Sequence, residues 1–79
     1  MTREEIYVSL NEVFRDVFDD DSITVKDETK STDIDRWDSL MHITLIGAVE
    51  DEFDMKFDMK DIVKMKNVGE MVDIIEREI

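Results

Sequence analysis

Residues 38–53 read DSLMHITLIGAVEDEF, a stretch without proline in which apolar side chains recur at the spacing of an α-helix. At about 100° per residue, one broad side of such a helix carries the residues expected to face a core: His42, Leu45, Ile46, Ala48, Val49 and Phe53. Asp38 stands just before them, where a carboxylate accepts hydrogen bonds from the free amides of a first helical turn. The stretch therefore predicts a helix that begins at Asp38 and continues to about Glu52.

Helical spacing extends over most of the remaining chain, which has no proline and only two glycines. One apolar face predicts a first helix over about residues 3–18: Ile6, Leu10, Val13, Phe14 and Val17, with Phe18 closing it. Asp58 offers a cap for a short helix over about residues 59–64. Asn67 and Glu70 have the spacing of a capping box and predict the start of a last helix. Its expected inner face consists of Val68, Met71, Val72, Ile75 and Ile79.

Residues 19–36 form a long acidic segment without a clear period, and their only apolar anchors are Ile23, Val25 and Ile34. The segment is longer than the usual connection between helices. We therefore expect that it is functional, that it is mobile, or that it contains a short turn of helix. The complete pattern predicts an all-α fold. We expect a small four-helix bundle of three longer helices and a short third helix, with a long loop between helices one and two, in a single domain of residues 1–79.

The composition is strongly acidic, since 22 aspartates and glutamates outnumber 10 lysines and arginines and give a formal net charge of −12. Such a charge repels nucleic acid and anionic membranes, so partners should carry basic patches. Cysteine is absent, which excludes disulfides and thiol catalysis and suits a reducing cytoplasm. No apolar run approaches the roughly 20 residues of a membrane span, and the N-terminus lacks the apolar stretch of a signal peptide. The composition predicts a soluble, cytoplasmic protein without membrane insertion.

Few residues are suited to catalysis or metal binding. His42 is the only histidine and falls on the core side of its helix, where a packed or hydrogen-bonded role is expected. A calcium-loop template started at Asp19 places Thr24 where glycine is required and Lys30 where the bidentate glutamate belongs. We therefore expect no metal site and no enzymatic activity of the chain's own.

A second apolar strip lies on the opposite side of the 38–53 helix. Leu40 and Ile43 fall there beside Ser39, in company with Thr44 and Gly47. Acidic residues rim this strip: Glu50, Asp51 and Asp54. An exposed apolar centre with an acidic rim is typical of a docking surface for a basic partner, although single exposed leucines are also common. The strip alone leaves both interpretations open.

Ser39 follows Asp38 in the first helical turn, where unpaired amides and the helix dipole favour a phosphate diester. The triplet Asp38-Ser39-Leu40 resembles the motif that heads the second helix of acyl carrier proteins. Residues 45–53, the loop 54–57 and residues 62–71 are similar to the corresponding segments of that family. The resemblance covers essentially the whole chain and is weakest in the acidic loop.

Three positions depart from the family pattern. Many members have glycine at the position of Arg36 and a small residue at that of Trp37. Trp37 either covers the core or shapes a distinctive partner contact. Members that serve fatty acid synthesis often have glutamate where this chain has Thr44. The resemblance therefore points to a stand-alone carrier for a specialised pathway.

The resemblance implies a 4′-phosphopantetheine arm on Ser39, transferred from coenzyme A by a phosphopantetheinyl transferase. The thiol of the arm would carry acyl intermediates as thioesters in fatty acid, polyketide or related specialised biosynthesis, and an acyl chain would lie between the helices. The implied partners are the transferase and acyl-transferring and acyl-processing enzymes with basic docking patches, acting on a monomeric carrier. The implied docking residues are Asp38, Leu40, Ile43, Thr44, Gly47, Glu50 and Asp51.

Two alternatives remain at this point. One is a peptidyl or aminoacyl carrier, which would be loaded by an adenylating enzyme instead of an acyl-transferring one. The other is an unmodified acidic helical adaptor, which would use the strip of Leu40 and Ile43 to bind a basic partner while Ser39 stays bare.

Overall fold

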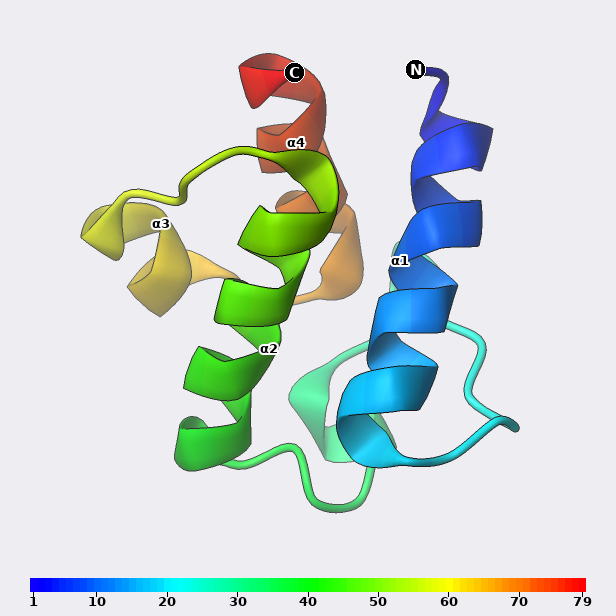
Figure 1. Ribbon diagram of the computed structural model, residues 1–79. Coiled ribbons are helices and arrows are strands. Elements are labelled where there is room, and N and C mark those ends of the chain that lie inside the picture. Colours follow the sequence, from blue (N-terminus) through cyan, green and yellow to red (C-terminus); the bar gives the residue numbers. More distant parts are fainter.

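The computed structural model describes residues 1–79 and contains four α-helices, one 3₁₀ turn and no strand. In chain order the elements are α1 (Arg3–Phe18), the turn η1 (Ser31–Asp33), α2 (Ser39–Phe53), α3 (Met59–Lys64) and α4 (Val68–Glu78). Helix α1 packs against α2 and α4, whereas the short α3 stands at the side of the bundle that is remote from α1 (Figure 1). The predicted all-α class is confirmed, with three longer helices and a short third one.

One apolar core holds the helices together. Its 17 buried residues form a single cluster, and no polar or charged side chain is buried. The cluster contains Ile6, Leu10, Val13, Phe14, Phe18, Val25, Leu45, Ile46, Val49, Phe53, Met55, Phe57, Val68, Met71, Val72, Ile74 and Ile75. The predicted inner faces of α1 and α2 therefore lie in the core, with Val17, His42 and Ala48 half-buried at its edge.

Side chains cap the starts of α1 and α2, of which only the Asp38 cap of α2 was predicted. The Thr2 hydroxyl accepts from the Glu5 amide, and the Glu5 carboxylate accepts from the Thr2 amide, which lowers the pKa of Glu5. Asp38 caps α2, because its carboxylate accepts from the Met41 amide over 2.8 Å. These caps fix where α1 and α2 begin.

Three predicted details at other helix ends are wrong. Asp58 precedes α3, but its side chain accepts no hydrogen bond from the first turn. Asn67 does cap α4 through the Glu70 amide, yet the Glu70 carboxylate accepts from the Lys66 amide and not from that of Asn67, so no capping box closes. Ile79 follows the last helical residue and is 49% exposed, because the apolar face of α4 ends in the core at Ile75.

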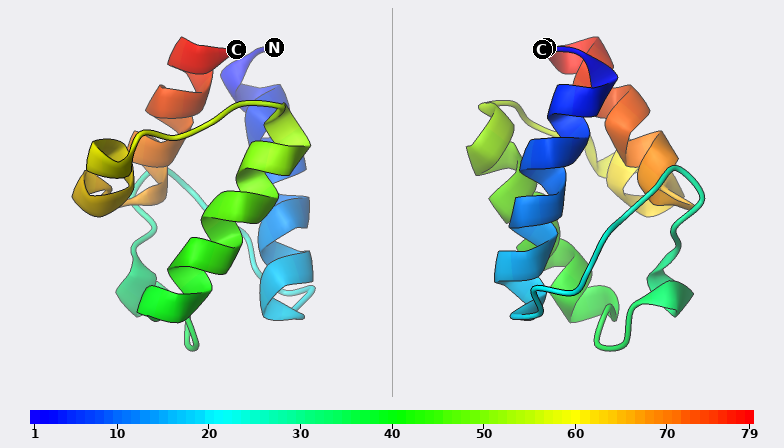
Figure 2. Two further views of the ribbon diagram at one scale, coloured as in Figure 1. Left: turned by 60° about the vertical axis from the view of Figure 1, so that its left-hand side comes forward. Right: turned by 90° about the vertical axis from the view of Figure 1, so that its right-hand side faces the viewer.

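The long segment between α1 and α2 is docked on the bundle. It contains the turn η1, as one of the predicted possibilities had it, and Val25 lies in the core. The segment runs up the outside of the bundle to the start of α4 and returns (Figure 2). There the Val68 amide donates to the Thr29 carbonyl over 2.8 Å and the Gly69 amide to the Asp27 carbonyl over 2.9 Å. The loop thus supplies acceptors for the otherwise free amides of a helix start.

Arg3 joins this loop to both ends of the chain. Its guanidinium forms ion pairs with Asp27, Asp73 and Glu76, and the Tyr7 hydroxyl donates to Asp27 as well. These hydrogen bonds, first from Tyr7 and then from Arg3, lower the pKa of Asp27. The Arg3 guanidinium, with these three carboxylates, therefore holds α1, the loop and α4 together.

Asp27→Asn is expected to remove a contribution to stability that depends on pH. A carboxylate whose folded pKa is lowered stabilises the fold above its ordinary pKa of about 3.9, and this contribution is lost as the pH falls through the folded pKa. Urea unfolding at several pH values should show wild type more stable than Asp27→Asn at pH 5–7, with the difference shrinking as the pH falls below the ordinary pKa of about 3.9. The control is the exposed neighbour Glu28 changed to Gln, which removes the same charge from a side chain without a hydrogen bond or ion pair. An equal loss of stability in the two variants would contradict the assignment to Asp27.

Candidate functional site

Ser39 is the first residue of α2, and its side chain is exposed and forms no hydrogen bond within the chain. The Asp38 carboxylate is occupied by the Met41 amide, and the Asp38 carbonyl accepts from the His42 amide. The amides of Ser39 and Leu40 have no acceptor in the chain. A free hydroxyl thus lies next to free amides at the positive end of a helix, which suits it to become a phosphate ester.

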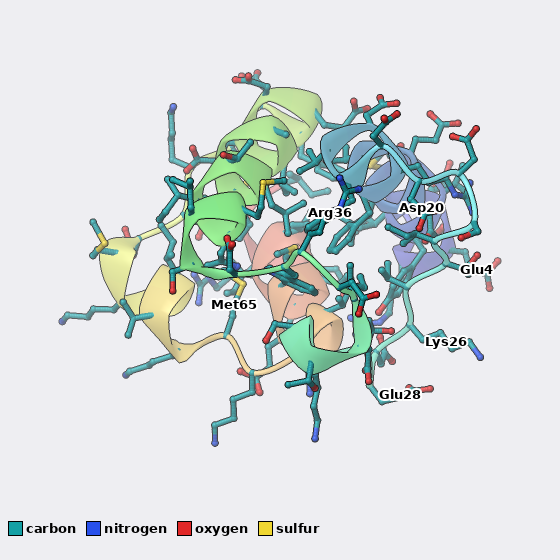
Figure 3. The ribbon with its side chains drawn as sticks, turned by 90° about the horizontal axis from the view of Figure 1, so that it is seen from below. Glu4, Asp20, Lys26, Glu28, Arg36 and Met65 are labelled. Carbon is teal, nitrogen blue, oxygen red and sulfur yellow. The ribbon has the colours of Figure 1, made fainter.

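The chain approaches Ser39 through a left-handed residue. Arg36 has φ 64°, a conformation that glycine adopts without strain and other residues rarely adopt. The Asp38 amide donates to the Arg36 carbonyl, which tightens the turn before α2. The Arg36 side chain points toward the segment after α1 (Figure 3), where it helps to lower the pKa of Asp20, mainly set by Ser22. A glycine at this position would remove that strain.

Arg36→Gly is expected to stabilise the protein by about 0.5–1 kcal/mol. Relief of the left-handed strain outweighs the greater freedom of glycine in the unfolded chain. Thermal unfolding should show a melting temperature raised by a few degrees. Lys26→Gly is the control, because it removes the same charge from a residue whose φ is not positive. This variant should lower the melting temperature. A lower melting temperature for Arg36→Gly would mean that the Arg36 side chain stabilises the fold by more than its left-handed backbone destabilises it.

Trp37 covers the core at the head of α2, as one of the two predictions for this residue had it. Its ring meets the edge of Phe14 at 5.3 Å between centroids and lies 6.1 Å from Phe18. Its Nε1 donates to His42 Nδ1 over 3.1 Å. Since Nδ1 accepts, the imidazole proton is on Nε2, which donates to the Ile62 carbonyl of α3 over 3.3 Å. His42 is therefore a hydrogen-bonded link between α2 and α3, as expected.

A groove of about 500 Å³ opens between α2 and α3 beside Ser39. Half of its lining is apolar: Trp37, Ile43, Ile62, Val63, Met65 and Met71. The other half is polar: Ser31, Asp38, Ser39, His42, Lys66 and Asn67. Figure 3 shows Met65 pointing into the space between α3 and the start of α2. The groove offers room for a slender group that begins at Ser39 and has both polar and apolar parts.

The apolar strip of α2 lies outside the core, as predicted. Leu40 is 76% and Ile43 60% exposed, and Thr44 is exposed beside them. Gly47 has open space where a side chain would stand. We call Asp38, Leu40, Ile43, Thr44, Gly47 and Asp51 the α2 face.

The acidic rim is correct for Asp51 and Asp54, which are exposed, and wrong for Glu50. The Glu50 side chain is only 16% exposed, because its carboxylate accepts from the Phe57 amide over 2.8 Å. This hydrogen bond holds the loop after α2 in place. A helical wheel shows only residues of its own helix and so does not show this bond.

Two exposed apolar residues of α3 were not predicted from the sequence. Met59 and Val63 are 73% and 77% exposed, next to the groove. Their spacing of four residues is the only signal in the sequence, and a helix of six residues is too short for this spacing to establish a face. Exposed apolar residues of α3 as well as of α2 therefore lie at the groove beside Ser39.

The chain matches the family model described as a phosphopantetheine attachment site over residues 9–75. It is 32% identical to a curated acyl carrier protein of Thermotoga maritima over 99% of this chain and 96% of that protein. The solution structure of a holo acyl carrier protein from Geobacter metallireducens superposes with a TM-score of 0.85 and 43% identity, covering 91% of this chain and 83% of that one.

The four-helix fold and these comparisons define a carrier of covalently tethered intermediates. The chain belongs to the acyl carrier protein family. It is a carrier and not an enzyme, and its cofactor is a covalently attached phosphopantetheine. No helix combines the length and apolar character needed to cross a membrane.

Proposed function

We propose that Ser39 is the attachment point of the phosphopantetheine arm and that the arm carries acyl groups for a specialised biosynthetic pathway. The observation that supports this assignment best is the free Ser39 hydroxyl at the start of α2, beside two amides without acceptors and a half-apolar groove. Membership of the family supports phosphopantetheine as the cofactor. The position of Ser39 in Asp38-Ser39-Leu40 supports this serine as the attachment point.

The chain's own residues have a binding and orienting part in this function. In the loading step a transferase accepts the Ser39 proton, the serine oxygen bonds to the phosphorus that bears pantetheine, and adenosine 3′,5′-bisphosphate leaves. The phosphopantetheine group supplies a thiol that forms thioesters, which this cysteine-free chain lacks. The free amides of Ser39 and Leu40 would stabilise the anionic diester. Tethering then raises the effective concentration of each intermediate for the next enzyme.

The α2 face is our proposal for the surface that docks enzymes with basic patches. Leu40 and Ile43 give it an apolar centre, and Asp51 and Asp38 give it negative charge. Glu50, named for this role in the sequence analysis, adds charge while its carboxylate stays bonded to the loop. We also propose that the carrier acts as a monomeric single domain in the cytoplasm, for which its cysteine-free composition is suited.

The test is the intact mass after incubation with coenzyme A and a broad-specificity phosphopantetheinyl transferase. A gain of one phosphopantetheine unit is expected. No gain in a protein with full helicity would overturn the carrier function and favour the unmodified adaptor. Once the arm is in place, loading by an acyl-transferring enzyme as opposed to an amino-acid-adenylating one would separate an acyl carrier from an aminoacyl carrier.

Ile43→Asp is expected to lower the transferase's kcat/KM for loading about tenfold or more, with stability changed by less than about 0.5 kcal/mol. Ile43 is exposed and contributes to docking without supporting the core. Val8→Asp is the matched control, since Val8 is 66% exposed on α1, away from Ser39. Loading rates and melting temperatures of both variants check the prediction. A large loss of stability in Ile43→Asp, or an equal loss of rate in Val8→Asp, would contradict it.

A further inference from the structure

The cations of this acidic chain are concentrated around one short helix. Residues 56–66 contain four of the ten basic residues and two of the 22 acidic ones, so this segment has a formal charge of +2 and the rest of the chain −14. The segment comprises α3 and the residues next to it. Its charge is opposite to that of the neighbouring α2, which contains Glu50, Asp51 and Glu52 and no lysine or arginine.

Most of these cations are free for an external partner. Lys60, Lys64 and Lys66 are exposed and form no ion pair, although the chain has more than twice as many acidic as basic residues. Lys56 lies 3.9 Å from Glu50, a long contact for a lysine side chain that is 86% exposed. The one acidic residue within α3, Asp61, is paired with Arg77 of α4 over 2.8 Å and so does not neutralise them.

An apolar pair lies among these lysines. Met59 and Val63 stand one helical turn apart and are 73% and 77% exposed, while α3 has no buried residue. We call Lys56, Met59, Lys60, Val63, Lys64 and Lys66 the lysine face. Val63 and Lys66 also line the groove beside Ser39, so the lysine face borders the site of the arm. Figure 1 shows that no other helix covers the outer side of α3.

We propose that the lysine face is a second docking surface, and that it binds an acidic surface with an apolar centre on an enzyme partner. The charge of the face selects carboxylates, and Met59 and Val63 supply the apolar contact. The inference rests on the proposed function, because such a partner acts on the arm of Ser39. A partner that covers both faces would place cations against α2 and carboxylates against α3. This opposite charge pattern permits only one orientation of the carrier.

The test uses two synthetic amphipathic helical peptides with identical leucine faces, one rimmed by glutamate and the other by lysine. Each is titrated into ¹⁵N-labelled protein at about 0.15 M salt, where the Debye length is about 8 Å. The acidic peptide should bind saturably and shift the amide resonances of residues 56–66. Because the net charge of −12 repels this peptide as a whole, saturable binding would come from the lysine face itself. The basic peptide should shift residues of α2.

Charge-reversal variants complete the experiment. Lys60→Glu and Lys64→Glu should each lower the affinity of the protein for the acidic peptide about fivefold or more. Lys26→Glu changes the net charge equally and should leave the affinity within about twofold, since Figure 3 shows Lys26 on the far side of the molecule from α3. Absence of saturable binding, shifts outside residues 56–66, or equal effects of all three variants would overturn the proposal. Tighter binding to phosphatidylglycerol vesicles than to the peptide would overturn it in favour of a lipid surface. Loading of Ser39, measured separately by mass, shows whether the proposed function has failed instead.

Discussion

Ser39→Ala is expected to abolish the gain of phosphopantetheine completely, while changing the free energy of unfolding by less than about 0.5 kcal/mol. The loss of modification is complete, because alanine has no oxygen to bond to phosphorus. The structural part is small, because the Ser39 side chain is exposed, forms no hydrogen bond and begins a helix in which alanine is the better helix former. Intact mass and urea unfolding, performed on the same preparations, measure both parts.

Asp38→Ala is the matched control for this variant. It removes the carboxylate that caps the Met41 amide, which should cost about 1 kcal/mol, but leaves the Ser39 hydroxyl in place. The two neighbouring substitutions should therefore have opposite outcomes, with Asp38→Ala less stable yet still modified on prolonged incubation. A mass gain in Ser39→Ala would assign the arm to another hydroxyl. A loss of folding in Ser39→Ala would make the serine structural.

The faces of the helices could be predicted from the sequence because one period decides them. Leu45 and Val49 lie inside and Leu40 and Ile43 outside, as a rotation of about 100° per residue requires. The start of α2 at Ser39 could be predicted for a related reason, since a cap residue before a strongly periodic segment fixes where the helix begins. Local rules were sufficient for these residues.

Contacts between distant parts of the chain could not be predicted in this way. Glu50 was expected in solvent because the wheel contains only its own helix, whereas its partner is the Phe57 amide in the following loop. Asp27 has no local signal at all, and its importance arises from Arg3 and Gly69, which are 24 and 42 residues away in the chain. Met59 and Val63 were missed because six residues are too few to establish a face. Sequence periodicity reports which side of a helix is apolar, and it does not report what lies opposite.

Gly69→Ala is expected to lower the free energy of unfolding by about 2 kcal/mol or more, which corresponds to roughly 10 °C in melting temperature for a domain of this size. Gly69 is buried in the first turn of α4, where an added Cβ would stand 2.9 Å from the Asp27 carbonyl oxygen and 3.1 Å from its Cα. Both atoms belong to the backbone, so the loop must move. This movement would stretch the bonds from the Gly69 amide to Asp27 and from the Val68 amide to Thr29.

Gly47→Ala provides the control for this prediction, because it is the same substitution in the interior of α2. A Cβ there would meet no atom within 4 Å, so alanine's better helix propensity should stabilise the protein by about 0.5–1 kcal/mol. The two substitutions should thus shift the urea midpoint in opposite directions. A similar rise in the free energy of unfolding for both variants would mean that the loop between α1 and α2, residues 19–38, moves aside with little loss of stability. The loop would then not be fastened to α4 as the bonds of Asp27 and Thr29 indicate, and the acidic segment would be free to move relative to the helix whose start it caps.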